Sequence, residues 1–401
     1  MTDVSVEMAR RGYRVRVYAS ARGYEDASVK YPAHEVLQGV EVRRLPLGSL
    51  GKKRFFLRVL GTAVFHLQAL LAGLFFPRID GIFFSTSPPL IGVVASIIGA
   101  IRRVPVAYWA MDLNPDQLIA IGKLKPMSFS ARVLEAVNRF ILRRASLIIA
   151  LDRFMADRLL TRGNYADKML VMPPWSHDEH IQQRSAGDNP FRIRHGLQGK
   201  FVIMYSGNHS PSNPLQTLLD AAVRLKNDDS LRFLFVGGGS GKKDVEAYIR
   251  DHQLTNVISL PYQPLSELGD SLSAADVHVV SLGEKMVGII HPCKIYGAMA
   301  VARPILYFGP RPSHIADLLD RHGFGVQVAH GDVDGAVKAI ERLKATGSGE
   351  LKRMGDEARN VMQEHLGQKA LTARFCDRLE GALFEAHRDT GVSPVQAASN
   401  P

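Results

Sequence analysis

The chain has 401 residues, which at roughly 100–200 residues per domain allows two or three domains and excludes a single small module. Apolar residues make up 46% and charged residues 22%, with only two cysteines, which excludes a disordered chain and a disulfide framework and favours a reducing compartment. The net charge is +11, and residues 1–180 carry nearly all of it, with 25 Lys and Arg against 15 Asp and Glu, which favours an anionic partner, although evenly solvated surface charge would give the same balance.

The chain begins with a predicted helix over residues 2–11, with Thr2 or Asp3 as its capping residue and Gly12 as its stop. A strand over residues 13–19 follows. No strand precedes the helix, so we expect the first domain to lack the element on which this helix packs.

Apolar runs and helical patterns then alternate, with strands predicted over 40–45, 81–85, 104–110, 147–151 and 168–172 and helices near 55–76, 90–101, 128–144 and 153–162. This rhythm indicates a parallel sheet covered on both faces. Pro173, Pro174 and Trp175, followed by a polar stretch, mark a boundary. We therefore place a first α/β domain at residues 1–176, which the resemblance described below makes an acceptor-side Rossmann-like domain.

A second series begins with a strand over 201–206 and repeats the alternation to a strand over 304–307, with mostly helical sequence from 334 to 387. It predicts a second doubly wound α/β domain at residues 177–375. Residues 376–401 are predicted to form a C-terminal helix and a frayed tail.

The predicted helix over 55–76 is apolar for about the length that spans a bilayer. Arg58, Thr62 and His66 share one of its faces, and charge at that depth is costly in lipid, which argues against a span. Two interpretations stay open: a helix lying in the membrane surface with Lys52, Lys53 and Arg54 on lipid phosphates, and a core helix of the first domain.

Two small-residue turns follow strands of the second half. The segment Tyr205-Ser206-Gly207-Asn208-His209-Ser210-Pro211 joins a strand to a helix, where free N–H groups and the helix dipole suit a diphosphate. The segment Gly237-Gly238-Gly239-Ser240-Gly241 resembles a dinucleotide fingerprint but lacks the third glycine and the acidic ribose clamp. These glycines therefore let a loop approach a ligand or simply turn.

The stretch from Pro292-Cys293-Lys294-Ile295-Tyr296-Gly297-Ala298-Met299-Ala300 to Ala302-Arg303-Pro304 carries a resemblance. With the turn at 205–211 and Trp109-Ala110-Met111-Asp112-Leu113-Asn114-Pro115-Asp116-Gln117, it resembles the retaining GT-B glycosyltransferases of family 4, in a branch similar to enzymes of bacterial surface-polysaccharide assembly. Three motifs in the right order make this a specific signal over nearly the whole chain.

The resemblance implies two Rossmann-like domains facing a cleft, a nucleotide-sugar donor, UDP-sugar in particular, and no metal or other cofactor. It implies that Lys294 stabilises the leaving diphosphate, which suits a cation at the start of a helix. The donor-binding residues it suggests are Ser206, Gly207, Asn208, His209, Gly237, Gly239, Glu284, Gly288, Lys294 and Arg303. For Arg303 a purely structural ion pair is the alternative.

The sequence departs from the family in two places. Where relatives carry two Glu seven residues apart, Ile289 and Gly297 stand here, so the ribose contact is lost unless Glu284 folds inward or backbone amides of residues 283–291 replace it. The family also begins with a strand and a Gly-rich loop ahead of the first helix. We expect a truncated reading frame and an unstable or inactive product as one outcome.

Asp112 and Asp116 follow a first-domain strand, where α/β ligands bind, and are the predicted acceptor-side residues, with Asp112 and Lys294 as the catalytic pair. Helix capping is the alternative for both aspartates. His291 is either a phosphate contact or a loop-packing residue. The adjacent residues His177, Asp178, Glu179 and His180 cannot easily converge on a metal, so we predict none.

These observations together predict a retaining glycosyltransferase that moves a sugar from a nucleotide-diphosphate donor to a lipid-linked or saccharide acceptor. Its partners would be the nucleotide-sugar, that acceptor and an anionic membrane surface, with no nucleic acid, at the cytoplasmic face of the bacterial plasma membrane. A non-catalytic GT-B protein and a nucleotide-sugar 2-epimerase are the alternatives; the latter would need acid and base residues in the cleft.

Overall fold

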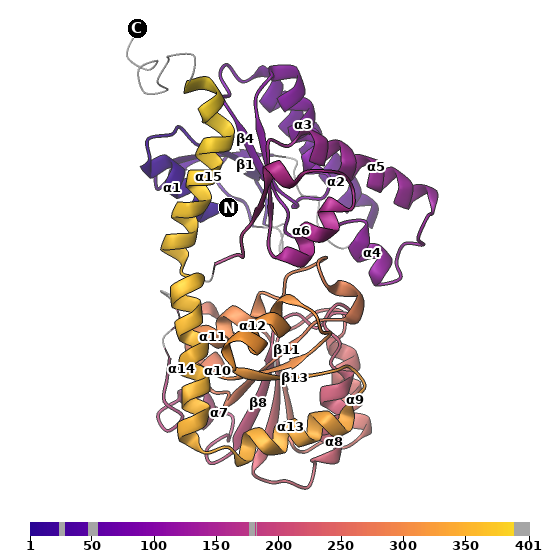
Figure 1. The fold of residues 1–401 in the computed structure, drawn as a ribbon, viewed down its shortest axis with the longest axis vertical. Helices are drawn as coiled ribbons and strands as arrows, with labels where there is room; N and C mark the ends of the chain where they lie inside the picture. Colours follow the sequence, from indigo (N-terminus) through magenta and orange to yellow (C-terminus); the bar gives the residue numbers. More distant parts are fainter. Residues whose placement is uncertain (24–28, 47–54, 176–180, 182, 389–401) are drawn as a thin grey trace.

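The computed structural model describes residues 1–23, 29–46, 55–175, 181 and 183–388, without the side chains of 55–58 and 385–388. Two α/β domains lie one above the other along the long axis (Figure 1), as the sequence predicted. The basic residues Lys52, Lys53 and Arg54, the side chain of Arg58, and the segment His177 to His180 lie outside this description.

The first domain contains two separate sheets. Strands β4 (Ile82–Ser85), β5 (Val106–Trp109), β6 (Leu147–Ala150) and β7 (Met169–Val171) form a parallel sheet, and β1 (Arg16–Ser20), β3 (Val40–Leu45) and β2 (His34–Leu37) form the other. Every residue of β5 and β6 is buried, as expected of strands covered on both faces. The helices are α1 (Thr2–Arg10), α2 (Phe55–Phe75), α3 (Ile91–Arg102), α4 (Asp116–Ala120), α5 (Phe129–Arg144) and α6 (Arg153–Leu160).

A cavity of about 1190 Å³ lies between the two sheets of the first domain. Residues of β1 and β4 line it together with α1, α2 and α3. Neither β1 nor β4 is hydrogen-bonded to another strand on the side that faces this space. The position between them is therefore open to an extended segment.

The second domain is built on one parallel sheet in the order β10-β9-β8-β11-β12-β13. Its strands are β8 (Phe201–Ser206), β9 (Leu231–Val236), β10 (Val257–Leu260), β11 (Val277–Ser281), β12 (Ile305–Phe308) and β13 (Gly325–Val328). Its helices are α7 (Pro190–Arg194), α8 (Gln216–Arg224), α9 (Lys242–Asp251), α10 (Leu268–Ser273), α11 (Lys294–Ala300), α12 (His314–His322) and α13 (Val333–Ala345), with short turns η3 (Leu265–Glu267) and η4 (Glu284–Met286).

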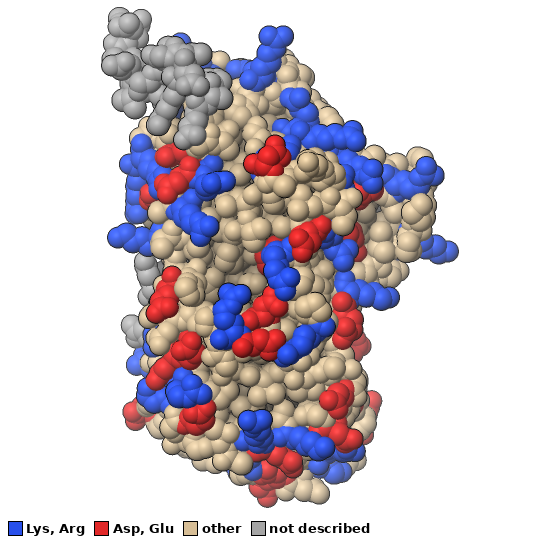
Figure 2. Space-filling view, viewed as in Figure 1, with Lys and Arg blue, Asp and Glu red and all other residues tan. Residues whose placement is uncertain are grey.

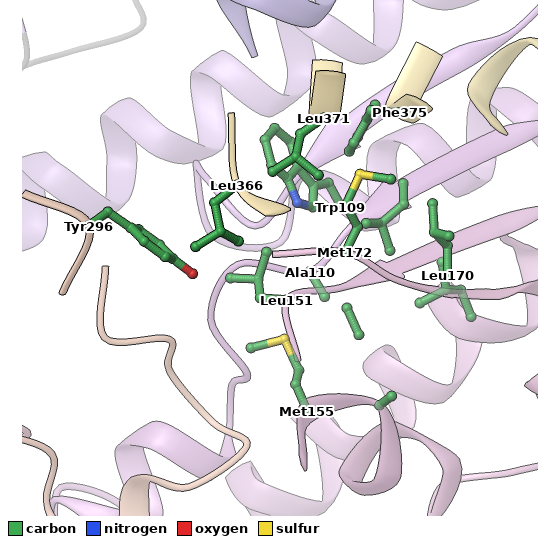
Figure 3. Close-up of a cluster of buried hydrophobic side chains, with 14 of the residues drawn as sticks. Trp109, Ala110, Leu151, Met155, Leu170, Met172, Tyr296, Leu366, Leu371 and Phe375 are labelled. Carbon is green, nitrogen blue, oxygen red and sulfur yellow. The ribbon is translucent and has the colours of Figure 1, made fainter. Parts of the chain in front are cut away.

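The last two helices connect the domains. Helix α14 (Ser348–His365) packs on α11 and α12 of the second domain, whereas α15 (Gln368–Arg388) packs on α1 and β5 of the first (Figure 1). Arg11, directly after α1, donates to Asp377 of α15 at 2.7 Å. One apolar core consequently runs through both domains, and Figure 3 shows Phe375 of α15 beside Trp109 of β5 in it.

Most predicted elements are confirmed within a few residues, and the differences have local causes. Strand β2 was not predicted because its four residues are mostly exposed and lack an apolar run. Helix α2 packs Phe65 and Ala69 against Val94 and Ile98 of α3, as a core helix does, and leaves another face exposed. Among the described helices none is long and apolar enough to cross a membrane.

Candidate active site

Two turns at the carboxyl ends of β8 and β9 lock together. His209 N–H donates to Gly238 O at 2.7 Å, and Gly241 N–H donates to His209 O at 3.0 Å. Gly237 and Gly239 adopt φ values of +133° and +128°, and a Cβ on Gly237 would overlap the carbonyl oxygen of Gly207. The glycines of the second turn are thus required by contact with the first turn.

His209 is buried within this pair of turns. Its Nδ1 lies 3.1 Å from Gly207 O, whereas its Nε2 has no hydrogen-bond partner among the described residues. Burial, reinforced by the charges of Lys242 and Lys294, lowers its pKa. A neutral imidazole with one unsatisfied buried nitrogen is a group that a polar ligand could satisfy.

Lys294 begins α11 and lies against the first turn. Its side chain crosses the space beside Gly207, where any Cβ would overlap the lysine chain, and its Nζ lies 5.1 Å from the ring centroid of Tyr205. With the Asn213 amide turned so that its oxygen faces Ser210, that oxygen accepts from Nζ at 3.2 Å. Burial lowers the pKa of Lys294 to about 8.

No carboxylate among the described residues pairs with Lys294. A partly buried ammonium without a counter-charge has lost part of its hydration and gained little in return. An anion that binds at Nζ would therefore be stabilised strongly. The chemistry of this corner suits a phosphate.

The loop before α11 ties the second domain to the first. Leu113 N–H donates to Ile289 O at 3.0 Å, and Asp112 forms an isolated antiparallel bridge with Ile290. This brings Asp112 near Cys293, and local desolvation of the sulfur, with a smaller effect of the Asp112 charge, raises the pKa of that thiol to about 11, although Cys293 as a whole is exposed. Asp112 is likewise exposed as a whole, and partial desolvation of its carboxyl group raises its pKa. Asp112 thus lies at the domain contact close to Cys293, the residue before Lys294, whereas the Lys294 side chain extends toward the turn at Gly207.

A hydrogen-bonded chain that the sequence analysis did not identify crosses the same contact. His291 Nδ1 donates to Asp152 Oδ2 at 2.8 Å, and Tyr296 Oη donates to His291 Nε2 at 2.5 Å. The ionised carboxylate only accepts, which fixes the proton on Nδ1 and makes Nε2 the acceptor. Asp152 and Tyr296 are 139 and five residues from His291 in the chain, so only folding brings the first one close.

Asp152 and Tyr296, the two ends of this hydrogen-bonded chain, have pKa values shifted in opposite directions. Burial would raise the pKa of Asp152, but the hydrogen bonds that the carboxylate accepts from His291 and from the Met155 N–H hold the pKa below its ordinary value. Burial keeps the pKa of Tyr296 well above 10, so its hydroxyl remains a donor. Near neutral pH, Asp152 therefore stays an acceptor and Tyr296 stays a donor in this hydrogen-bonded chain.

Three predicted site residues have other surroundings. Arg303 precedes β12 and so lies at the opposite edge of the sheet from Lys294, where it donates to Ser273 O at 3.0 Å; the structure does not bring it to the donor turns. Asp116 accepts from Arg158 at 3.0 Å and from Arg162, so both of its oxygens are engaged. A Cβ on Gly288 would overlap Phe154 O, so that glycine serves the domain contact.

Glu284 and the metal prediction complete the comparison with the sequence. Glu284 is exposed at the start of η4 and makes no ion pair with any described residue. In the described part of the chain, no group of three His, Cys, Asp or Glu could hold a metal ion. The segment His177 to His180 is outside that description.

Comparisons with known proteins agree in both halves of the chain. Residues 1–175 match the Glycosyl transferase 4-like domain, and residues 200–345 match the Glycosyl transferases group 1 family. Probable glycosyltransferase WbjE of Pseudomonas aeruginosa is 24% identical over 309 residues, 77% of this chain and 76% of that protein. Putative colanic acid biosynthesis glycosyl transferase WcaI of Escherichia coli K12 is 24% identical over 255 residues, 63% of this chain and 61% of that protein.

A solved structure shows the same architecture. Anabaena HepE in complex with UDP and glucose superposes with a TM-score of 0.70 at 16% identity, covering 94% of each chain. At that identity the likeness concerns the fold. Two Rossmann-like domains are therefore the arrangement in both proteins.

Proposed function

The chain belongs to the family 4 glycosyltransferases with the GT-B fold, and from that premise we propose that it moves a sugar from a UDP-sugar to a lipid-linked or saccharide acceptor, with retention at the anomeric carbon. The relatives named for surface polysaccharides support a role in bacterial cell-surface polysaccharide biosynthesis. The neighbour that holds UDP and glucose supports a uridine nucleotide as donor.

Lys294 carries this proposal. It is a partly buried cation without a carboxylate partner among the described residues, and it lies beside the turn at Gly207 and the unsatisfied Nε2 of His209. In the reaction, negative charge grows on the β-phosphate oxygen as the glycosidic bond breaks. The ammonium stabilises that charge more than it stabilises the ground state, and losing one such contact costs on the order of 10²–10³ in rate.

We propose that the diphosphate is neutralised by this chain's own groups, with no metal ion. Lys294 Nζ supplies the charge, and the backbone N–H groups of the turn after Ser206 supply hydrogen bonds. Asp112, across the domain contact, orients the acceptor hydroxyl. Its raised pKa reflects partial desolvation, which suits a carboxylate that receives a proton during transfer.

An open groove supports an acceptor path along the first domain. It has a volume of about 490 Å³ and lies between α4, α6 and the loop of the second domain that contains Val287. Arg158 lines it with a side chain that is 38% exposed, while Asp116 holds that guanidinium in place. A phosphate-bearing acceptor would meet Arg158 there. We propose that this occurs at the cytoplasmic face of the plasma membrane.

Thermal unfolding with UDP, GDP or ADP, each with and without EDTA, tests the donor assignment. A nucleotide at 100 times its Kd stabilises the folded state by about 2.7 kcal/mol. We expect UDP to stabilise the protein in EDTA, and Lys294→Ala to abolish that shift. If no nucleotide stabilises the wild-type protein, the donor site is wrong.

Lys168→Ala is the matched control. Lys168 is also partly buried, donates to Ala145 O at 2.7 Å and lies 5.2 Å from the Tyr165 ring centroid, but it is in the first domain away from the turns. This variant is expected to lower the melting temperature and to keep the UDP shift. Retention is tested separately by the NMR coupling constant of the anomeric proton of the product. UDP binding without any sugar transfer would support the non-catalytic alternative.

A further inference from the structure

Large exposed apolar side chains gather on one part of the first domain. Among the described residues, eleven lie between positions 59 and 140, whereas residues 200–388 contribute two, Tyr262 and Leu265. Met127 and Phe129, at the junction of α4 and α5, are each 82% exposed. Apolar surface concentrated in this way marks an interaction site.

These side chains belong to one layer of helices. Helix α3 packs between α2 and α5 on the sheet that contains β4 and β5. On α5, Phe129, Val133 and Phe140 follow helical spacing and are exposed, whereas Ile141 and Leu142 are buried. The neighbouring helix α2 likewise exposes Leu60, Leu67, Leu71 and Phe75, spaced seven, four and four residues apart. The outer surface of the layer is therefore apolar over several helices.

Positive charge surrounds the apolar tip. Residues 117–144 contain six Lys and Arg and a single acidic residue, Glu135, which is held by Arg139 at 3.2 Å and Arg162 at 3.1 Å. Lys123, Lys125 and Arg132 make no ion pair with any described residue. Figure 2 shows Lys and Arg side chains around the part of the first domain that projects on the right, where α4 and α5 lie in Figure 1.

We infer that this face docks on an anionic lipid bilayer, with Met127 and Phe129 among the acyl chains and Lys123, Lys125 and Arg132 on the lipid phosphates. An apolar surface with a basic border is what an interfacial protein presents to such lipids. A second copy of the protein fits this face less well than a bilayer does, because it would bring these cations against one another. Glu135, the only acidic residue of the segment 117–144, is already paired and cannot offset that repulsion.

The docking face is connected directly to the proposed acceptor side. Helix α4 begins four residues after Asp112 and leads to the tip at Met127, and α4 also contacts η4 of the second domain. A bilayer at the tip would therefore hold lipid-linked acceptors beside the domain contact. The delivery of a lipid-linked acceptor to the domain contact rests on the proposed function, whereas binding of the protein to a bilayer does not.

Co-sedimentation with vesicles tests the inference without any substrate. We expect the wild-type protein to bind vesicles of phosphatidylcholine and phosphatidylglycerol, to bind phosphatidylcholine alone weakly, and to be released by salt. Changing Met127 and Phe129 together to Asp should lower the partition coefficient at least about tenfold. Leu265→Asp, at a side chain 85% exposed in the second domain, is the control and should bind as the wild type does.

A charge pair of variants isolates the electrostatic contribution. Lys125→Ser should weaken binding about fivefold, whereas Lys338→Ser, an exposed lysine of the second domain, should not. Circular dichroism and the UDP-dependent thermal shift confirm that each variant is folded. Equal vesicle binding by the wild type and the variant with Asp at positions 127 and 129 would overturn the inference. So would a wild-type protein that binds no vesicles and forms a dimer by light scattering, if that dimer is lost in the same variant. A retained UDP shift in that case leaves the proposed function standing.

Discussion

Asp152→Ala is expected to destabilise the first domain and to weaken donor binding in the second. Asp152 has two roles: Oδ1 accepts from Met155 N–H at 2.8 Å and caps α6, and Oδ2 accepts from His291 at 2.8 Å across the domain contact. The Asp152 and His291 side chains are 3% and 0% exposed. The change therefore leaves an unpaired helix terminus and an unpaired buried Nδ1–H on His291, whose Nε2 still accepts from Tyr296.

The magnitude follows from these two losses. Removing the cap costs about 1 kcal/mol, and leaving a buried ring N–H without its acceptor costs about 1–3 kcal/mol. We expect a total of about 2–4 kcal/mol in the free energy of unfolding. Because the folded pKa of Asp152 lies below 3.8, its stabilisation is present above that pH and is lost as the pH falls through the lower, folded value.

Urea unfolding followed by tryptophan fluorescence measures this cost, since Trp109 and Trp175 are the only tryptophans and stack in the first-domain core. Asp317→Ala is the control: it removes the ion pair with Arg153, which also joins the two domains but has side chains 59% and 30% exposed, and should cost below about 1 kcal/mol. UDP affinity should fall in the first variant alone, because His291 lies three residues before Lys294. Equal effects of the two changes would refute the importance of the buried pair.

Three other predictions address the donor turns and the core. Gly207→Ala would force a Cβ into the Lys294 side chain at φ +147°, so UDP affinity measured by calorimetry should fall about tenfold or more, whereas Gly347→Ala, with open space around it, should leave it unchanged. Glu284→Ala should weaken UDP binding but leave pyrophosphate binding intact if this carboxylate contacts the ribose; equal loss for both ligands would exclude that contact. Burial lowers the pKa of His278 to about 4, so the unfolded chain takes up a proton between pH 6.5 and 4 that the folded protein does not. Stability should fall by about 1.4 kcal/mol per pH unit on acidification in that range from this group, and the slope should be smaller by that amount in His278→Gln.

The local sequence was sufficient to predict those parts of the candidate site that are formed by one strand and the turn that follows it. The strand over 201–206, its glycine turn and the lysine at the start of α11 could all be placed in one α/β domain because the strands alternate with helices. The same reasoning misplaced Arg303. It is nine residues from Lys294 in the chain, but α11 carries the chain from the carboxyl edge of the sheet to the opposite edge before β12 begins.

Contacts between the domains could not be predicted from patterns within either one. Asp152 and His291 belong to different domains, and neither position has a local spacing that indicates the other. The resemblance suggested Gly288 as a donor-binding residue, whereas its neighbour is the Phe154 carbonyl of the first domain. Such features depend on how two independently folded sheets meet, which periodicity does not encode.

The polypeptide passes between the two domains twice, once between β7 and α7 and once at Leu366 and Gly367 between α14 and α15 (Figure 1). The two domains are therefore joined both by the chain and by the apolar core that they share. Leu366 is buried in the shared core, so the second crossing is itself packed between the domains. A smaller residue at Leu366 would leave a cavity in the core between the domains and destabilise their junction, with every group of the donor turns left in place.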